Sequence, residues 1–402
     1  MTAMHPSPSP SVGAPGRIVI VGHGIAGLTA GDTLRREGFS GELTVIGQEP
    51  HDPYSRPALS KAMLEDLSTP SPGAVTEIEA QYLAAPSEGA TVHAGRSAVG
   101  LDPEAQTVLL DDGGVLAYDG LVITSGARAR RFTDSPDEYT LRGLDDARAL
   151  RQRLAGRPAV IVIGGGPLGM EVASAAREAG CEVTLVHRGQ PMRRHVGDVL
   201  AGLCTSAARD RGLHLVDASV TRVHRDAPDG GLDIELSTGG TLRAEVIVSA
   251  IGDAPNDEWL ADSGLLTDGR LLIDDWGIVA PGVVAAGDVA WRRSGPGIQR
   301  RALWTDAIEQ AKVAAEALLH GRSASPASYA PYFWTEQFGL NLRICGEVPA
   351  EVTPTVVDGD LAESRAVLQW EDPTQGGAAA AVNFRIPIPK LRRLARPAPA
   401  AA

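Results

Sequence analysis

Residues 160–169 read Val-Ile-Val-Ile-Gly-Gly-Gly-Pro-Leu-Gly, a short apolar run that leads directly into glycines. Its glycines have the spacing Gly164-x-Gly166-x-x-Gly169, they follow a short apolar strand, and a helical pattern continues to Gly180. A strand, a glycine turn and a helix with this spacing form the fingerprint of a dinucleotide-binding unit. The first glycine allows a tight turn, the second lets the backbone approach a pyrophosphate, and the third lets the helix pack on the strand.

The same pattern occurs a second time, near the start of the chain. Residues 17–27 read Arg-Ile-Val-Ile-Val-Gly-His-Gly-Ile-Ala-Gly, which gives Gly22-x-Gly24-x-x-Gly27 after another strand. One such motif alone is weak evidence, but two in one chain indicate two bound dinucleotides. We therefore expect electrons to pass from one dinucleotide to the other.

Composition narrows the class of protein. A length of 402 residues predicts about two to four domains. The hydrophobic share of 43% and charged share of 22% are typical of a globular protein in water, and the net charge of −13 argues against nucleic-acid binding. No apolar run approaches the ~20 residues of a membrane span. Residues 1–16 are rich in Pro and Ser, so we expect a disordered tail rather than a signal peptide, and a cytoplasmic protein.

The cysteines exclude several kinds of site. There are three, Cys181, Cys204 and Cys345, and they are far apart with no Cys-x-x-Cys pair. A disulfide framework, a zinc site and an active-site dithiol are therefore not expected. Redox chemistry in this chain would have to reside in its cofactors, and we expect no bound metal.

Hydrophobic periodicity and turn residues predict the elements between the two motifs and after them. The expected strands are 17–21, 42–46, 121–124, 246–251 and 278–285, with hairpin-rich segments at 91–117 and 213–241. The expected helices are 25–37, a start at 60–67, 145–154 and 302–320. The last ~70 residues look like strands with a basic tail at 390–396, after a linker at 322–331.

Four further segments, in order, resemble one family. They are Arg56-Pro57-Ala58-Leu59-Ser60-Lys61, Gly287-Asp288, Leu303-Trp304-Thr305-Asp306-Ala307 with Gln310-Ala311, and Phe333-Trp334-Thr335-Glu336-Gln337. Over nearly the whole chain after the tail, this order resembles the FAD-dependent NAD(P)H:ferredoxin reductases of putidaredoxin reductase type. Such enzymes serve bacterial cytochrome P450s and ring-hydroxylating dioxygenases.

The resemblance implies an α/β fold with two Rossmann-like domains of the glutathione-reductase type and a C-terminal α+β interface domain. The FAD domain would be split between residues 17–124 and 251–322, the NAD(P) domain would span 125–250, and the interface domain 327–402. The implied activity is hydride transfer from NADH or NADPH to FAD, followed by single-electron transfer to a [2Fe–2S] or other small acidic ferredoxin. That ferredoxin would supply a P450 or a dioxygenase.

The resemblance also implies the site residues. Lys61, at the flavin ring, and Glu171, which would pair with it at the nicotinamide pocket, are the candidate catalytic residues. FAD would lie against Gly22, Gly24, Ala26, Gly27, Arg56, Ala98, Arg142, Asp288, Trp304 and Trp334, with its adenosine ribose on Glu49 or Gln48. The nicotinamide dinucleotide would lie against Gly164, Gly166, Leu168 and Gly169.

Several of these residues have a simpler explanation. Glu49 could be a solvated loop carboxylate, Lys61 a surface lysine, and Glu171 a compensation of the helix dipole. Asp288 could be a turn residue, and Trp304 and Trp334 core aromatics. His23, between two glycines, is expected to be only a tolerated loop residue.

One departure from the family pattern concerns the choice of nucleotide. In NADH-preferring relatives, an acidic residue near His187 holds the ribose 2′-hydroxyl. Here the strand ends in His187-Arg188, and Arg188 with Arg193 or Arg194 could bind a 2′-phosphate. We therefore expect NADPH to be tolerated or preferred.

An acidic ferredoxin would need a locally basic docking face. The candidates are Arg292, Arg293, Arg300, Arg301, Lys312, Arg343, Lys390, Arg392 and Arg393; a solvated charge run is the alternative. Two rival functions stay open, namely an NAD(P)H oxidase or diaphorase, and a redox-gated flavoprotein that acts by binding other proteins.

Overall fold

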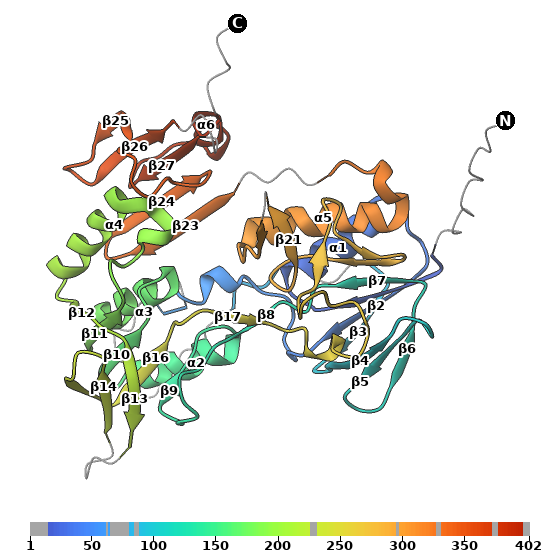
Figure 1. The fold of residues 1–402 in the computed structure, drawn as a ribbon, viewed down its shortest axis with the longest axis horizontal. Coiled ribbons are helices and arrows are strands. Elements are labelled where there is room, and N and C mark those ends of the chain that lie inside the picture. The colour runs from blue at the N-terminus through green and yellow to red at the C-terminus, as the bar shows by residue number, and fades with distance from the viewer. Residues whose placement is uncertain are drawn as a thin grey trace, which may run out of the picture.

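The computed structural model describes residues 15–61, 63–64, 80–83, 88–225, 231–294, 297–326, 331–371 and 377–396. Figure 1 shows their arrangement as two mostly parallel sheets with flanking helices, and a third, antiparallel sheet near the C-terminus. The tail expected at residues 1–16 lies almost entirely outside the described residues. Of the helix start expected at 60–67, only residues 60, 61, 63 and 64 are described, and they form turns after a 3₁₀ helix, η1 (Arg56–Ala58).

The first sheet carries the first glycine motif. Its order is β19-β20-β7-β1-β2-β3, with all pairs parallel except β19 with β20. The strands are β1 (Arg17–Val21), β2 (Glu42–Gly47), β3 (Ala90–Ala94), β7 (Gly120–Ile123), β19 (Ile278–Ala280) and β20 (Val283–Ala285). Helices α1 (Ile25–Arg36) and α5 (Trp304–His320) cover one face, where Leu34 and Ala311 are fully buried. The central strands are apolar throughout because both faces are covered.

A small antiparallel sheet covers the opposite face of the first sheet. It consists of β4 (Ala98–Asp102), β5 (Thr107–Leu110) and β6 (Val115–Ala117). Val108 and Leu110 share a core with Val19 and Leu121 of the first sheet.

The second sheet carries the second glycine motif. It is parallel, with the order β12-β11-β10-β16-β9, and comprises β9 (Glu138–Tyr139), β10 (Ala159–Ile163), β11 (Glu182–His187), β12 (His214–Asp217) and β16 (Val246–Ser249). Helices α2 (Leu144–Leu154) and α3 (Pro167–Glu178) share one core with it. A meander of β13 (Val220–His224), β14 (Leu232–Leu236) and β15 (Thr241–Ala244) shares a separate core with the side chains of Ile161 and Ile163.

Two short strands connect the sheets. β8 (Ala127–Ala129) leaves the first sheet, β17 (Asp253–Pro255) returns to it, and the two pair antiparallel. After β17, the chain forms η2 (Glu258–Leu260) and a three-stranded sheet of β18 (Leu272–Ile273), β21 (Trp291–Ser294) and β22 (Gly297–Gln299). Helix α5 is followed by η3 (Gly321–Ser323). The second dinucleotide unit is thus an insertion into the first.

The C-terminal sheet is antiparallel, with the order β23-β24-β27-β26-β25. Its strands are β23 (Tyr332–Gln337), β24 (Leu340–Cys345), β25 (Thr355–Asp360), β26 (Arg365–Trp370) and β27 (Ala378–Val382), and α6 (Ile388–Leu394) follows. β23 and β24 lie beside α3 and α4 (Arg193–Asp210) (Figure 1). The sheet therefore packs on the unit that carries the second glycine motif.

The expected strands and helices around both glycine motifs are confirmed, with three corrections elsewhere. Residues 278–285 are not one strand, because Gly282, with φ +73°, reverses the chain between β19 and β20. In the segments expected to be rich in hairpins, β3 is instead an edge strand of the first parallel sheet, and β12 is an edge strand of the second. The basic tail forms helix α6, whose Leu391 is fully buried against the C-terminal sheet.

Candidate functional site

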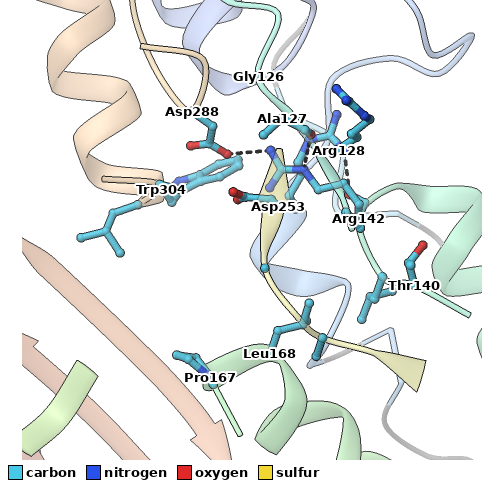
Figure 2. A pocket seen from close by; sticks show the side chains of 18 of the residues that line it. Gly126, Ala127, Arg128, Thr140, Arg142, Pro167, Leu168, Asp253, Asp288 and Trp304 are labelled. Atoms are coloured by element: carbon cyan, nitrogen blue, oxygen red, sulfur yellow. Dashed lines mark hydrogen bonds and ion pairs between the residues drawn. The ribbon is translucent and has the colours of Figure 1, made fainter. Parts of the chain in front are cut away.

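One cavity joins the two glycine motifs. It has a volume of about 2170 Å³ and is lined by both glycine loops, by Lys61 and Glu171, and by Trp304 and Trp334. Figure 2 shows Pro167 and Leu168 on one side and Asp288 and Arg142, joined by a dashed line, on another. The remaining expected residues that line it are Ala26, Gln48, Glu49, Arg56, Ala98, His187 and Arg188. Gly27 and Gly169 are not among the lining residues, because each packs its helix on its strand.

The first glycine loop is closed toward the protein and open toward the cavity. A Cβ on Gly22, whose φ is +121°, would lie 2.0 Å from the carbonyl oxygen of Thr124, and one on Gly27 would lie 1.9 Å from that of Gly22. A Cβ on Gly24 would meet no atom within 4 Å. Helix α1 begins just after Gly24 with no side-chain cap and no acidic residue in its first turn. Its free N–H groups therefore face open space that suits a pyrophosphate.

The second loop repeats this geometry. A Cβ on Gly164, whose φ is +116°, would lie 2.2 Å from the carbonyl oxygen of Ala250, and one on Gly169 would clash with Gly164. A Cβ on Gly166 would meet only the Cε1 atom of His195, at 3.8 Å. Helix α3 also starts without a side-chain cap or an acidic first turn. Both loops thus fit a dinucleotide.

Lys61 and Glu171 form an ion pair where the parts of the chain meet. The Nζ atom of Lys61 lies 2.9 Å from Oε2 of Glu171, and the two side chains are 12% and 5% exposed. Nζ also lies 3.3 Å from the carbonyl oxygen of Pro57 and 5.7 Å from the ring centre of Trp334. The cavity thus has a partly buried ammonium group held close to an indole face.

The expected ribose-binding residue Glu49 is held by its neighbours. Tyr54 donates its hydroxyl proton to Oε2 of Glu49, and Arg56 donates to Oε1. Arg56 also donates to the carbonyl oxygen of Arg142 at 2.7 Å, and the Tyr54 oxygen accepts from the N–H of Leu144 at 2.9 Å. Burial raises the pKa of Tyr54 and keeps its hydroxyl protonated. Glu49 is therefore held by two side chains although it is 34% exposed, and each oxygen keeps a lone pair for a ligand.

Asp288 lies in a second charged cluster. Its Oδ2 accepts from Arg142 at 2.6 Å, and its carbonyl oxygen accepts from Arg300 at 2.8 Å. Arg142 also donates to the carbonyl oxygen of Ala127 at 2.8 Å, and Arg300 pairs with Asp253. This cluster attaches the turn after β20 to the strands that connect the two sheets.

His187 and Arg188 lie at the end of β11, beside the second glycine loop. His187 is buried and its Nδ1 has no hydrogen-bond partner among the described residues, while Arg188 is exposed. Burial lowers the pKa of His187. The carboxylate of nearby Asp217 accepts from the N–H of Gly189 at 2.8 Å.

Eight of the nine basic residues proposed for docking fall into two groups, and the ninth, Arg292, is half-buried. Arg300 is 12% exposed and paired with Asp253, Arg301 pairs with Glu347, and Lys312 pairs with Glu309. Arg343 donates to the carbonyl oxygens of Ile386 and Phe384. Arg293, Lys390, Arg392 and Arg393 are exposed. Sequence reasoning could not tell the paired arginines from the exposed ones, because the partners of Arg300 and Arg343 are distant in the chain.

Sequence reasoning also missed residues that hold the candidate site together. Tyr54 and the hydroxyl groups of Ser60 and Thr335 contact the carboxylates of Glu49 and Glu171. Ser60 and Thr335 lie inside the family-like segments, but nothing in the sequence says where their hydroxyl groups point.

The cysteines take no part in this site. Cys181, Cys204 and Cys345 are all buried, and none of them lines the cavity. Among the residues that the structure describes, there is no cluster of His, Cys, Asp or Glu that could hold a metal ion. Within the same residues, no helix is long and apolar enough to cross a membrane.

Comparisons with known proteins agree with this geometry. Residues 16–316 match the model of the pyridine nucleotide-disulphide oxidoreductase family. The 3-phenylpropionate/cinnamic acid dioxygenase ferredoxin–NAD(+) reductase component of Photorhabdus laumondii is 34% identical over 385 residues, which cover 94% of this chain and 95% of that protein. The anthranilate 1,2-dioxygenase system ferredoxin–NAD(+) reductase component of Burkholderia cepacia is 35% identical over 389 residues, with 94% and 93% covered.

Solved structures show the same fold. The ferredoxin reductase for the CYP199A2 system from Rhodopseudomonas palustris superimposes with a TM-score of 0.81 at 28% identity, covering 92% of this chain and 91% of that one. Putidaredoxin reductase in its covalent complex with putidaredoxin gives 0.79 at 27% identity, with 91% and 89% covered. Two glycine loops open to one cavity, and similarity over nearly the full length, lead to one conclusion: the chain belongs to the pyridine nucleotide-disulphide oxidoreductase family.

Proposed function

We propose that this protein transfers a hydride from NAD(P)H to FAD and then passes electrons singly to a small iron–sulfur ferredoxin. The cavity that connects two open glycine loops without a lining cysteine carries this proposal, because it provides for two dinucleotides and no thiol relay. The names of its relatives, which are reductase components of dioxygenase systems, support a ferredoxin as acceptor and a dioxygenase or P450 as the final consumer. We include a cytoplasmic location in the proposal, since NAD(P)H is its electron donor.

We assign FAD to the loop at Gly22–Gly27 and the nicotinamide dinucleotide to the loop at Gly164–Gly169. Bound FAD would supply both hydride acceptance and one-electron release. The N-terminus of α1 would hold its pyrophosphate, Glu49 its ribose hydroxyls, and Asp288 its ribityl chain. In domain terms, residues 17–124 and 251–322 would bind FAD, 125–250 would bind NAD(P), and 327–402 would form the interface domain.

Lys61 would stabilise negative charge that develops on the flavin ring. Its ammonium group is 12% exposed, so its field acts in a poorly solvated site and is weakly screened. Glu171 neutralises the positive charge of Lys61 before the flavin is reduced and holds the ammonium group at a defined place. Beyond this, the protein would only need to hold the nicotinamide and flavin rings stacked and aligned, because hydride transfer needs little acid–base assistance.

For ferredoxin docking, we favour helix α6. Lys390, Arg392 and Arg393 are exposed on it, and no ion pair to them is present within the described part of the chain. The same helix packs on the sheet face that carries Tyr332 and Trp334, whose rings stack at 5.8 Å. An acidic partner on α6 would therefore lie near the aromatic residues that border the cavity.

Docking on α6 can be tested by reversing its charge. Arg392→Glu with Arg393→Glu should slow ferredoxin reduction at low salt and leave flavin reduction by NAD(P)H unchanged, whereas Lys312→Glu, on a residue already paired with Glu309, should change neither. Rates with ferredoxin that stay flat as salt rises would contradict electrostatic docking.

The proposed function itself is tested by anaerobic rapid mixing with NADH or NADPH, followed by a [2Fe–2S] ferredoxin, while flavin absorbance is recorded. Fast bleaching and reoxidation by ferredoxin is the expected result. Fast bleaching that only oxygen reverses would identify an oxidase, and a slow bleach to a persistent charge-transfer band would identify the redox-gated binding protein. Absence of flavin even after reconstitution with FAD would refute the proposal.

A further inference from the structure

The carboxylate of Glu171 receives three hydrogen bonds from two other parts of the chain. Lys61 donates from Nζ to Oε2 at 2.9 Å, Ser60 donates its hydroxyl proton to the same oxygen, and Thr335 donates from Oγ1 to Oε1 at 2.7 Å. Glu171 lies on α3, Ser60 and Lys61 follow η1, and Thr335 lies on β23 of the C-terminal sheet. One carboxylate thus joins both dinucleotide units and the C-terminal sheet.

The Thr335 hydroxyl is built into this position. Thr335 is fully buried, and Ser60 and Glu171 are 6% and 5% exposed. The Nε2 atom of Gln337, also buried, lies 3.2 Å from Oγ1 of Thr335 and donates to it. The ion-paired carboxylate of Glu171 only accepts, so the hydroxyl proton of Thr335 points at it, while the Thr335 oxygen accepts from Gln337. The chain from Gln337 through Thr335 to Glu171 therefore has a single direction.

The two carboxylate oxygens of Glu171 have different donors, and this difference sets the position of the Lys61 ammonium group. Thr335 donates to Oε1, and the ammonium group of Lys61 is bound through the other oxygen, Oε2. An ammonium has three N–H groups; Glu171 takes one and the carbonyl oxygen of Pro57 lies 3.3 Å away for a second. The third has no partner among the described residues and is available to the cavity. Without the Thr335 hydroxyl, Oε1 would have no donor among the described residues, and the carboxylate would be free to turn and accept a second N–H of the Lys61 ammonium group.

We propose that Thr335 is a positioning residue that acts through Glu171 to set where the Lys61 ammonium group stands. The C-terminal sheet would thereby help to tune the flavin site, in addition to any role in docking. The inference rests on the proposed function, because it assumes a flavin beside Lys61.

Thr335→Val removes the hydroxyl while nearly keeping the shape of the side chain. We expect it to slow flavin reduction by NADH about tenfold, mainly in the limiting rate rather than in the apparent affinity, because hydrogen bonds behind a functional group have effects of about this size. The reduction potential of the bound flavin, measured against redox dyes with dithionite as the reductant, should become more negative, as it should in Lys61→Met. Thr335→Ser, which restores the hydroxyl, should return both quantities close to the wild-type values.

Two controls separate positioning from a general loss of packing. Thr205→Val removes another buried hydroxyl, which donates to the carbonyl oxygen of Ala201 at 2.8 Å on α4 away from the cavity, and it should change neither rate nor potential. In a Glu171→Gln background, Thr335→Val should add little, because the route through Glu171 is already broken.

The inference is overturned if Thr335→Val keeps the wild-type rate and potential while Lys61→Met changes both. It is also overturned if the cost persists in full in the Glu171→Gln background, or if Thr335→Ser does not restore the values. Failure of the proposed function looks different, since the wild-type flavin would then not be reduced by either nucleotide, and the potentials of the variants would still report on the network.

Discussion

Gly24→Ala should weaken FAD binding while leaving the folded protein intact. Gly24 has φ −88° and ψ −169°, which alanine adopts without strain, and its Cβ would meet no protein atom within 4 Å. The new methyl group would instead enter the space in front of the α1 N-terminus, where we place the pyrophosphate. The same substitution at Gly27 would drive a Cβ to 1.9 Å from the carbonyl oxygen of Gly22, so Gly27→Ala should damage the fold itself.

The expected size follows from these contacts. Forcing one methyl group into a filled site costs about 1–3 kcal/mol, which corresponds to about 5- to 150-fold weaker binding. The apoprotein should lose no stability and could gain up to about 1 kcal/mol, because alanine restricts the unfolded chain more than glycine does. Binding and stability are thus expected to change in opposite directions.

Titration of the apoprotein with FAD, followed by quenching of flavin fluorescence, measures the first effect, and denaturant unfolding of the apoprotein measures the second. Gly166→Ala is the matched variant in the other loop: it should leave FAD affinity unchanged and weaken NAD(P)H. Wild-type FAD affinity in Gly24→Ala, or a destabilised apoprotein, would refute the assignment of this loop to the FAD pyrophosphate.

Three further predictions follow from charge and burial. Burial alone would raise the pKa of Glu138, but contact with Ser249 and hydrogen bonds from two backbone N–H groups and the Thr133 hydroxyl lower it below its usual value. The ionised carboxylate therefore stabilises the fold at neutral pH. This stabilisation is lost as the pH falls through the lowered pKa. Denaturant unfolding should show Glu138→Gln less stable than wild type by about 1–3 kcal/mol at pH 7, with the gap closing in acid, and an equal gap at both pH values would contradict this. Burial raises the pKa of Cys204 to about 12 and that of Cys345 to about 11, so a thiol reagent at pH 8 should label neither until the protein is denatured, and labelling of the native protein would show the cores to be open. Arg188→Glu should lower affinity for NADPH but not for NADH, and an unchanged preference in steady-state kinetics would sink the proposed phosphate contact.

The parallel sheets were the most predictable part of the fold. β1 and β10 are short apolar runs that end in glycines, and the requirement for a tight turn and a close helix leaves few other structures for them. The expectation of one strand at 278–285 overlooked Pro281-Gly282, a dipeptide that marks turns, and the chain reverses there between two short apolar strands. Local pattern failed at α6, because a seven-residue helix whose stability comes from one buried face has too little periodicity to detect.

The candidate site was predictable only where a residue's neighbours in sequence are also its neighbours in space. The glycine loops meet that condition, so the tight turn and the close packing of helix on strand could be predicted for both. The pairing of Lys61 with Glu171 came from resemblance, since 110 residues separate them. Arg300 shows the opposite case: it reads as one of a run of surface arginines, but Asp253 and the carbonyl oxygen of Asp288 meet it in the interior.

The position of Thr335 explains why the remaining part of the site escaped prediction. On β23, side chains alternate between two faces, so Trp334 and Thr335, adjacent in sequence, serve opposite sides of the sheet. Trp334 stacks with Tyr332 near α6, whereas Thr335 reaches Glu171 on α3. Which face meets α3 depends on how the whole C-terminal sheet docks, and that is set by apolar contacts among Phe338, Leu342 and the cores of α3 and α4. A hydroxyl that completes a charged site from another sheet therefore becomes visible only once the tertiary packing is known.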